Sequence, residues 1–108
     1  MILATTETIA GYRTTEHLGT VVGNTIRARH IGRDIMAGLR TLIGGEIKEY
    51  TKMLAESREQ SLQRMILQAQ HLGADAIVGI RFQTSMILAS TAELLVYGTA
   101  VKLTRSIE

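Results

Sequence analysis

The chain of 108 residues is 45% apolar and 20% charged, which is typical of one globular domain, and we expect that domain to span residues 1–108. Its formal net charge of +2 is small for a nucleic-acid-binding protein, because phosphate recognition usually takes several clustered cations. The sequence holds no cysteine, which excludes disulfides, thiolate metal sites and thiol catalysis.

Two strands are predicted in the first part of the chain, a short one over residues 2–6 and a long or bent one over residues 12–29. In the long segment β-branched residues are frequent and side chains alternate between two faces, as they do along a strand. One face carries Leu18, Thr20, Val22, Asn24, Ile26 and Ala28, and the other carries Gly19, Val21, Gly23, Thr25, Arg27 and Arg29.

Two helices are predicted in the middle of the chain. Residues 31–43 place apolar side chains at helical spacing, and Gly44-Gly45 ends this element as a corner between helices. The second helix, over residues 46–72, has charged residues opposite a less polar stripe, and Gly73 terminates it. That stripe consists of Ile47, Tyr50, Leu54, Ser57, Ser61, Met65 and Leu72, with Leu62 and Ala69 beside it.

Two further strands are predicted after Gly73, over residues 74–82 and 92–103. The first is a buried strand that places Ala76, Val78, Ile80 and Phe82 on one face. The two strands are close enough in sequence to form a hairpin with a loose connection. The predicted order is β-β-α-α-β-β, an α/β (α+β) fold in which an antiparallel sheet packs on one long helix plus a short helix.

Helix length and strand glycines both predict a homo-oligomer. A helix over residues 46–72 would be about 40 Å long, whereas a compact domain of this size is only about 34 Å across. Glycine inside a strand often marks a close approach of another backbone, although a simple bulge is the alternative. The glycines concerned are Gly19, Gly23, Gly79 and Gly98.

Three stretches of the sequence, "RARHIGRDIMAGLRTLIGGEIKEYTKML", "QAQHLGADAIVGIRF" and "YGTAVKL", resemble the YbjQ-like family. The resemblance runs from about Met1 to Leu103. Its combination of residues is Arg33-Asp34, Gly38, Arg40, Gly44-Gly45, Tyr50, Gly73-Ala74, Gly79 and Gly98-Thr99-Ala100-Val101.

The resemblance implies a small α/β subunit with a fold similar to that of dodecin subunits, and a closed ring of five identical copies. It also implies a heavy-metal-binding label, without an established activity. The chain departs from the family at residues 83–92, which hold the apolar run Met86-Ile87-Leu88-Ala89 where relatives are more often polar and glycine-rich, and we interpret this connection as a packed edge strand. It also departs at His30, where relatives commonly have asparagine, so no metal role is carried over to His30.

The histidines do not predict a metal site or another cofactor within one chain. His17, His30 and His71 show no ligand spacing such as i, i+4, and zinc needs three or four converging donors. A ring would bring symmetry copies of His30 together near its axis, which makes His30 a weak candidate ligand.

Arginines gather in one basic stretch. Arg27 and Arg29 share a strand face, and Arg33 and Arg40 lie two helical turns apart. Because arginine forms bidentate bridges with carboxylates at interfaces, we favour salt bridges between subunits, for which Glu16, Asp34 and Glu93 are available. A pocket for a small anionic ligand is the second interpretation. Nucleic-acid contact is the third, disfavoured because we expect no exposed aromatic side chains for base stacking.

Known catalytic motifs are missing from this sequence. It holds no nucleophile elbow, P-loop or dinucleotide fingerprint, and Asp34 is best explained as a helix-start carboxylate. Asp34, Gly44, Gly45, Gly79 and Gly98 are therefore expected to have structural or interface roles.

The functional prediction is a ring-forming binding or scaffold protein that holds a small anion or a metal ion at its interfaces. The alternative is a small-molecule enzyme using Arg29, Arg33 and Asp34. The N-terminus does not resemble a signal peptide, and the longest uncharged run, residues 82–92, is too short to span a membrane. We therefore expect a cytoplasmic protein without membrane contact.

Overall fold

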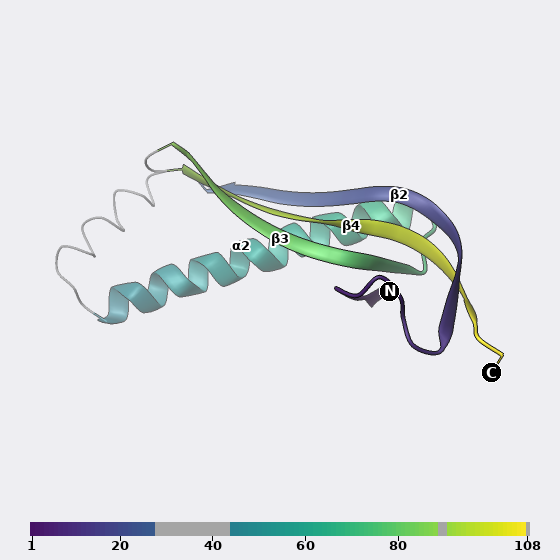
Figure 1. Cartoon of the computed structure of the whole chain (residues 1–108). Helices are drawn as coiled ribbons and strands as arrows, with labels where there is room; N and C mark the ends of the chain where they lie inside the picture. Colours follow the sequence, from purple (N-terminus) through teal and green to yellow (C-terminus); the bar gives the residue numbers. More distant parts are fainter. Residues whose placement is uncertain (28–43, 89–90, 108) are drawn as a thin grey trace.

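The computed structural model describes residues 1–27, 44–88 and 91–107, and these form a four-stranded sheet and one helix (Figure 1). The elements are β1 (Ile2–Leu3), β2 (Tyr12–Arg27), α2 (Gly44–His71), β3 (Ala76–Leu88) and β4 (Thr91–Arg105). The strand order in the sheet is β1-β3-β4-β2. β4 is antiparallel to both neighbours, whereas β1 pairs with β3 in parallel, so the sheet is mixed rather than antiparallel.

The predicted α+β class with one long helix on a sheet is thereby confirmed in its coarse form. The short helix predicted over residues 31–43 lies outside the described residues, as do positions 28 and 29 of the long strand. The full order β-β-α-α-β-β and the dodecin-like comparison therefore stay predictions.

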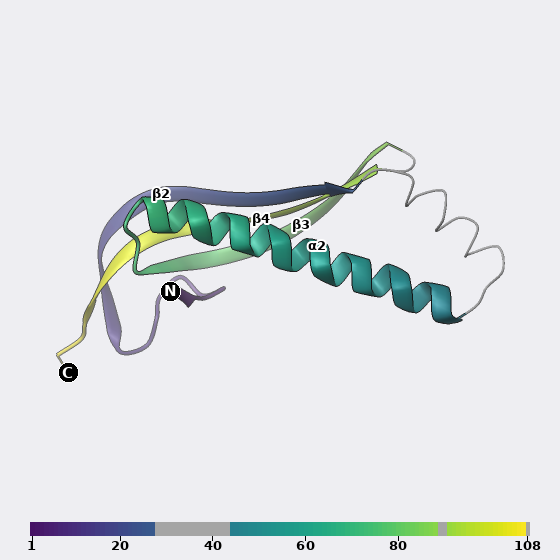
Figure 2. The ribbon, with the colours of Figure 1, turned by 180° about the vertical axis from the view of Figure 1, so that it is seen from behind.

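α2 lies along one face of the sheet, mainly against β2, then β4, with little contact to β3. Figures 1 and 2 show that its C-terminal half packs on the strands while its N-terminal half diverges from them. The chain is elongated, with extents of 59 × 23 × 16 Å and a radius of gyration of 17.6 Å. The predicted domain width of about 34 Å was therefore wrong. Strands of 15 and 16 residues are at least as long as the helix, so the helix does not outreach its own sheet.

Residues four apart on α2 form its buried stripe: Ser57, Ser61, Met65 and Ala69. This confirms most of the predicted stripe over the part of the helix that touches the sheet. Leu72 is the exception, at 45% exposed, because α2 ends at His71 and Leu72 belongs to the turn that follows. The core between the helix and the sheet consists of Val21, Met65, Ala69, Ile77, Ile80, Val96 and Ala100.

A second, smaller cluster lies on the other face of the sheet. It consists of Ala76, Val78 and Val101, with Ile9 and Leu103 packed against it. The N-terminal segment is fixed there by backbone hydrogen bonds from Gly79 N to Thr6 O (2.9 Å) and from Ile80 N to Ala4 O (3.1 Å). Arg81 Nη1 also donates to Thr5 O at 2.9 Å. This segment therefore covers one end of the face that α2 leaves open.

A β-bulge at Gly79 overturns the prediction that Ala76, Val78, Ile80 and Phe82 share one face. The register of β3 against β4 shifts between Val78 and Arg81, and Gly79 has φ +63°. The extra residue reverses the alternation. Consequently Ile77 and Ile80 belong to the core under the helix, whereas Ala76 and Val78 belong to the second cluster.

The remaining element boundaries also differ from the predictions. β3 continues to Leu88 and β4 begins at Thr91, so the hairpin is confirmed but its connection is short. The edge-strand interpretation holds over residues 83–88, although residues 83–85 are exposed rather than packed. α2 begins at Gly44, so Gly44-Gly45 lies in its first turn rather than before it; the element that these glycines were predicted to end lies outside the described residues. No helix in the described part of the chain combines the length and apolarity needed to cross a membrane.

Candidate functional site

The seam between α2 and β2 is closely packed at Gly23. A Cβ placed on Gly23 would overlap the Ser61 carbonyl oxygen and stand 2.6 Å from Met65 N. Only glycine allows the helix backbone to approach the strand this closely. The sequence-based expectation of a close approach is thus correct for Gly23, but the approaching backbone belongs to the same chain.

Three hydroxyl side chains, Thr25, Ser57 and Ser61, are buried in this seam at 3%, 1% and 0% exposed. The Ser61 Oγ lies 2.9 Å from Thr25 Oγ1 and 2.9 Å from Ser57 O. Thr25 Oγ1 also donates to Ser57 O at 3.2 Å. A hydroxyl has one proton and two lone pairs, so Thr25 and Ser61 are satisfied by each other and by the Ser57 carbonyl inside the core. Ser61 Oγ bonds Thr25 Oγ1, Ser57 O and Leu94 O, so its hydroxyl takes part in core hydrogen bonding and the cluster is a structural one.

The outer edge of β2 is covered by two side chains of α2. Val22 N donates to Gln68 Oε1 at 2.7 Å, and Arg64 Nη1 donates to Asn24 O at 2.5 Å. Sequence reasoning missed both contacts, because Arg64 and Gln68 resemble any other solvated residues on the polar side of a helix.

The sheet face away from α2 is partly apolar beyond the N-terminal segment. Val22, Ile26 and Tyr97 are 41%, 56% and 37% exposed, and Val22 is the register partner of Tyr97. We call these three residues the open sheet face. Beside them, Asn24 Nδ2 donates to Glu93 Oε2 at 3.0 Å, so Glu93 is held by an amide at the rim of this face.

Most of the predicted anion-binding residues fall outside the described part of the chain. Arg27 is the last residue of β2, in register with Ala92. The others, Arg29, Arg33 and Arg40, lie outside the described residues. So do Asp34, predicted to be structural, and His30, the weak candidate metal ligand. The structure therefore does not test whether the four arginines converge.

The predicted structural glycines have distinct roles. Gly79 forms the β3 bulge. A Cβ on Gly98 would stand 2.7 Å from Ile77 Cγ2 and 3.2 Å from Ile80 Cγ1, so Gly98 makes room for the core. Gly19 has φ +123° next to a register shift, so the bulge alternative is correct for Gly19 and Gly79.

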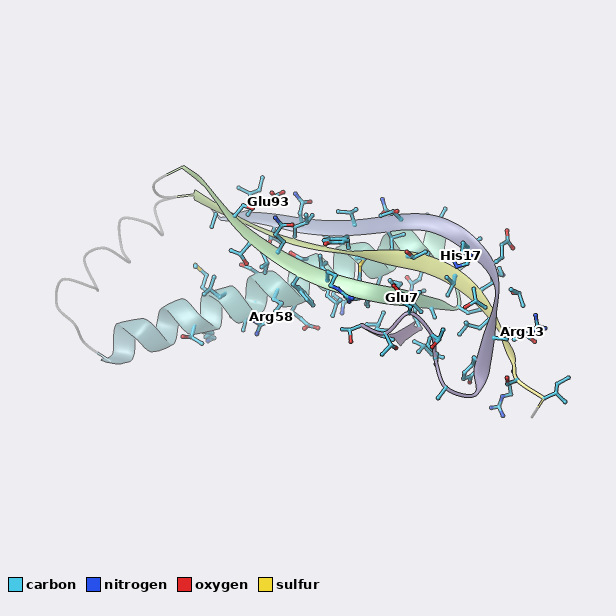
Figure 3. All side chains as sticks on the ribbon, in the orientation of Figure 1. Glu7, Arg13, His17, Arg58 and Glu93 are labelled. Carbon is cyan, nitrogen blue, oxygen red and sulfur yellow. The ribbon has the colours of Figure 1, made fainter. Side chains whose placement is uncertain are left out.

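The potential metal ligands of the described residues lie apart. Figure 3 shows His17 and Glu93 toward opposite ends of the sheet. His71 Nδ1 lies 2.8 Å from Leu67 O, within its own helix. Among the residues that the structure describes, no group of three or more histidine or acidic side chains could hold a metal ion.

Comparison with known proteins identifies relatives over nearly the whole chain. A family model with the description "Putative heavy-metal-binding" (YbjQ) matches residues 1–104. UPF0145 proteins from Methanoculleus marisnigri and Methanosarcina acetivorans are 58% and 56% identical, covering 95% of this chain and 96% and 97% of theirs. A UPF0145 protein from Pseudothermotoga lettingae is 57% identical over 95% of this chain and 97% of its own.

A solved structure supports the fold. The crystal structure of a protein of unknown function from Pediococcus pentosaceus, placed in the DUF74 family, matches with a TM-score of 0.66. It is 18% identical, and the match covers 96% of this chain and 98% of that one. At this identity the likeness shows the fold alone.

Proposed function

Because the chain belongs to the YbjQ-like, UPF0145 family, we propose that it is a non-enzymatic protein that assembles into a closed homopentameric ring and acts as a binding or scaffold protein. The observation that carries this proposal is the open sheet face. Val22, Ile26 and Tyr97 keep 41%, 56% and 37% of their surface exposed. Val22 lies beside Tyr97, and Ile26 follows four residues further along the same face of β2, past the polar Asn24. Exposed apolar side chains gathered on one sheet face are typical of interaction sites.

The total surface of the chain also supports a partner. The chain exposes 7333 Å², whereas a compact monomer of 11.8 kDa exposes about 5,900 Å². The excess of about 1,400 Å² is close to the roughly 1,600 Å² that one subunit of a ring would bury in two interfaces of about 800 Å² per partner. A second copy of the chain is the partner that the elongated shape and the diverging helix fit.

We propose that the basic stretch forms salt bridges between subunits. Arg27, Arg29, Arg33 and Arg40 carry planar, permanently charged groups that bind carboxylates in two-point fashion. The same chemistry suits a small anionic ligand such as phosphate, which is the ligand class we propose for the ring. We assign no heavy-metal site to the described residues, because their donor side chains do not fit one.

A phosphate titration of the untagged protein tests the ligand part of this proposal. Differential scanning calorimetry in a zwitterionic buffer should show a melting temperature that rises with the phosphate concentration, because a ligand that binds only the folded state stabilises that state. Chloride at matched ionic strength is the control. Equal melting temperatures in phosphate and chloride would argue against an anion site.

A further inference from the structure

Two strands of the described sheet have an edge to which another strand could pair: β2, and the part of β3 that β1 and the N-terminal segment do not cover. β2 is the outermost strand at one side of the order β1-β3-β4-β2. Alternate residues of such a strand direct their backbone N–H and C=O groups away from the sheet. Val22 N–H and Asn24 C=O are two such groups, and they are the ones that an added strand would use.

Two side chains of α2 occupy these groups. Gln68 Oε1 accepts the Val22 N–H at 2.7 Å, and Arg64 Nη1 donates to Asn24 O at 2.5 Å. The spacing of Arg64 and Gln68 along α2 matches that of Val22 and Asn24 along β2. Four helical residues rise about 6 Å, and two strand residues span about 6.6 Å. One helix face thus mimics the hydrogen bonding of a neighbouring strand.

The edge of β3 is different. β1 and the N-terminal segment bond to β3 as far as Ile80. Beyond that point, from Phe82 to Leu88, the described residues supply β3 with no strand partner other than β4. Phe82 is 45% exposed there. The described sheet therefore has one edge closed by side chains and one edge that is open over part of its length.

We infer that Arg64 and Gln68 guard the β2 edge against pairing with a strand of a second copy, and so limit the assembly to a closed particle. This inference rests on the proposed self-assembly and adds a feature that limits how far the assembly can grow. A sheet with strand-accepting edges on both sides can add copies head to tail without closing, which leads to fibres or aggregates. Closing one edge removes that route while the open sheet face stays available to the ring.

The experiment compares four forms of the full chain. The test variant Arg64→Ala/Gln68→Ala removes both guarding groups. The conservative variant Arg64→Lys/Gln68→Glu keeps a donor and an acceptor at the same positions. The control Arg58→Ala/Gln70→Ala makes the same residue changes at exposed positions of α2. Sedimentation velocity over a concentration series gives the particle masses, and NMR hydrogen exchange reports the Val22 amide.

The wild type, the conservative variant and the control should share one mass distribution. The test variant should exchange its Val22 amide about tenfold faster, as expected for one lost hydrogen bond, and should form larger species that grow with concentration. An unchanged mass distribution in a folded test variant would overturn the inference, and so would an unchanged Val22 exchange rate. If the double variant does not fold, Gln68→Ala decides by the same two readouts.

The wild-type mass separates the two proposals. A monomeric wild type would remove the proposed ring, whereas the difference between test and control variants would still decide whether the edge is guarded.

Discussion

Gly23 of β2 lies so close to Ser61 of α2 that a Cβ at position 23 would overlap the Ser61 carbonyl oxygen. The contact joins strand backbone to helix backbone, and neither can move aside as a flexible side chain can. It sets the distance between the helix and the sheet, and thereby brings Thr25 into hydrogen-bond range of Ser61.

Replacing Gly23 by alanine should therefore force α2 away from β2. Overpacking usually costs about 1–3 kcal/mol, and we expect Gly23→Ala to reach the upper part of that range in urea unfolding. Gly19→Ala is the comparison, because it adds backbone strain without a neighbour within 4 Å. Only the Gly23 variant should also speed hydrogen exchange at Val22, whose partner Gln68 moves with the helix. Equal exchange rates in the two variants would contradict the close contact.

Removal of the Ser61 hydroxyl should destabilise the seam by about 1–2 kcal/mol, because it leaves buried polar groups without their partner. Thr25→Val should cost less, since Ser61 still reaches Ser57 O at 2.9 Å and Leu94 O at 3.1 Å. The double variant should lose less than the two single losses together, as residues in one hydrogen-bond network do. Strictly additive losses in urea unfolding would show that the two hydroxyls act independently.

The bulge at Gly79 should tolerate asparagine better than valine. Its φ of +63° is accessible to asparagine but rare for β-branched residues, and a Cβ there meets nothing within 4 Å. Gly79→Val should therefore lower the free energy of unfolding by about 1–3 kcal/mol, and Gly79→Asn by clearly less. Similar losses in both variants would mean that the left-handed conformation is not what requires glycine.

The alternation of β2 beyond Gly19 and the stripe of α2 were predictable from sequence, because periods of two and of about 3.6 show directly in residue type. Leu18, predicted on the face of Val22, packs instead against the core that contains Val21, because the register shifts between His17 and Gly19. The bulge was not, since a glycine inside an apolar strand is equally consistent with a regular strand. Once Gly79 adds a residue, Ile77 rather than Val78 faces the helix, and every face assignment before it reverses.

The seam was half predictable. Ser57 and Ser61 fell on the predicted stripe, and Gly23 and Thr25 on one strand face, but their pairing depends on which strand the helix crosses. That small residues of a strand face small residues of a helix can be recognised only when the three-dimensional structure shows which strand and helix are in contact. The contacts of Arg64 and Gln68 left no trace, because helix surfaces carry such residues for solubility as well.

The variant Arg33→Ala distinguishes the two hypotheses for the basic stretch, salt bridges between subunits and a pocket for an anionic ligand. If Arg33 forms a buried salt bridge between subunits, its removal leaves the partner carboxylate uncompensated, at a cost of about 3–5 kcal/mol, and every subunit repeats the loss. We therefore expect a lower melting temperature or failed assembly by calorimetry and light scattering. Arg33→Lys should recover only part of the loss, because lysine keeps the charge without the two-point geometry. An intact particle of undiminished melting temperature would favour the anion pocket instead.

Native mass spectrometry of untagged protein at micromolar concentration tests the proposed ring most directly. We predict one dominant species of about 59 kDa, five times the 11.8 kDa chain, with any bound anion visible as added mass. A dominant mass of one chain, 11.8 kDa, would contradict the ring and leave the open sheet face without the partner proposed for it.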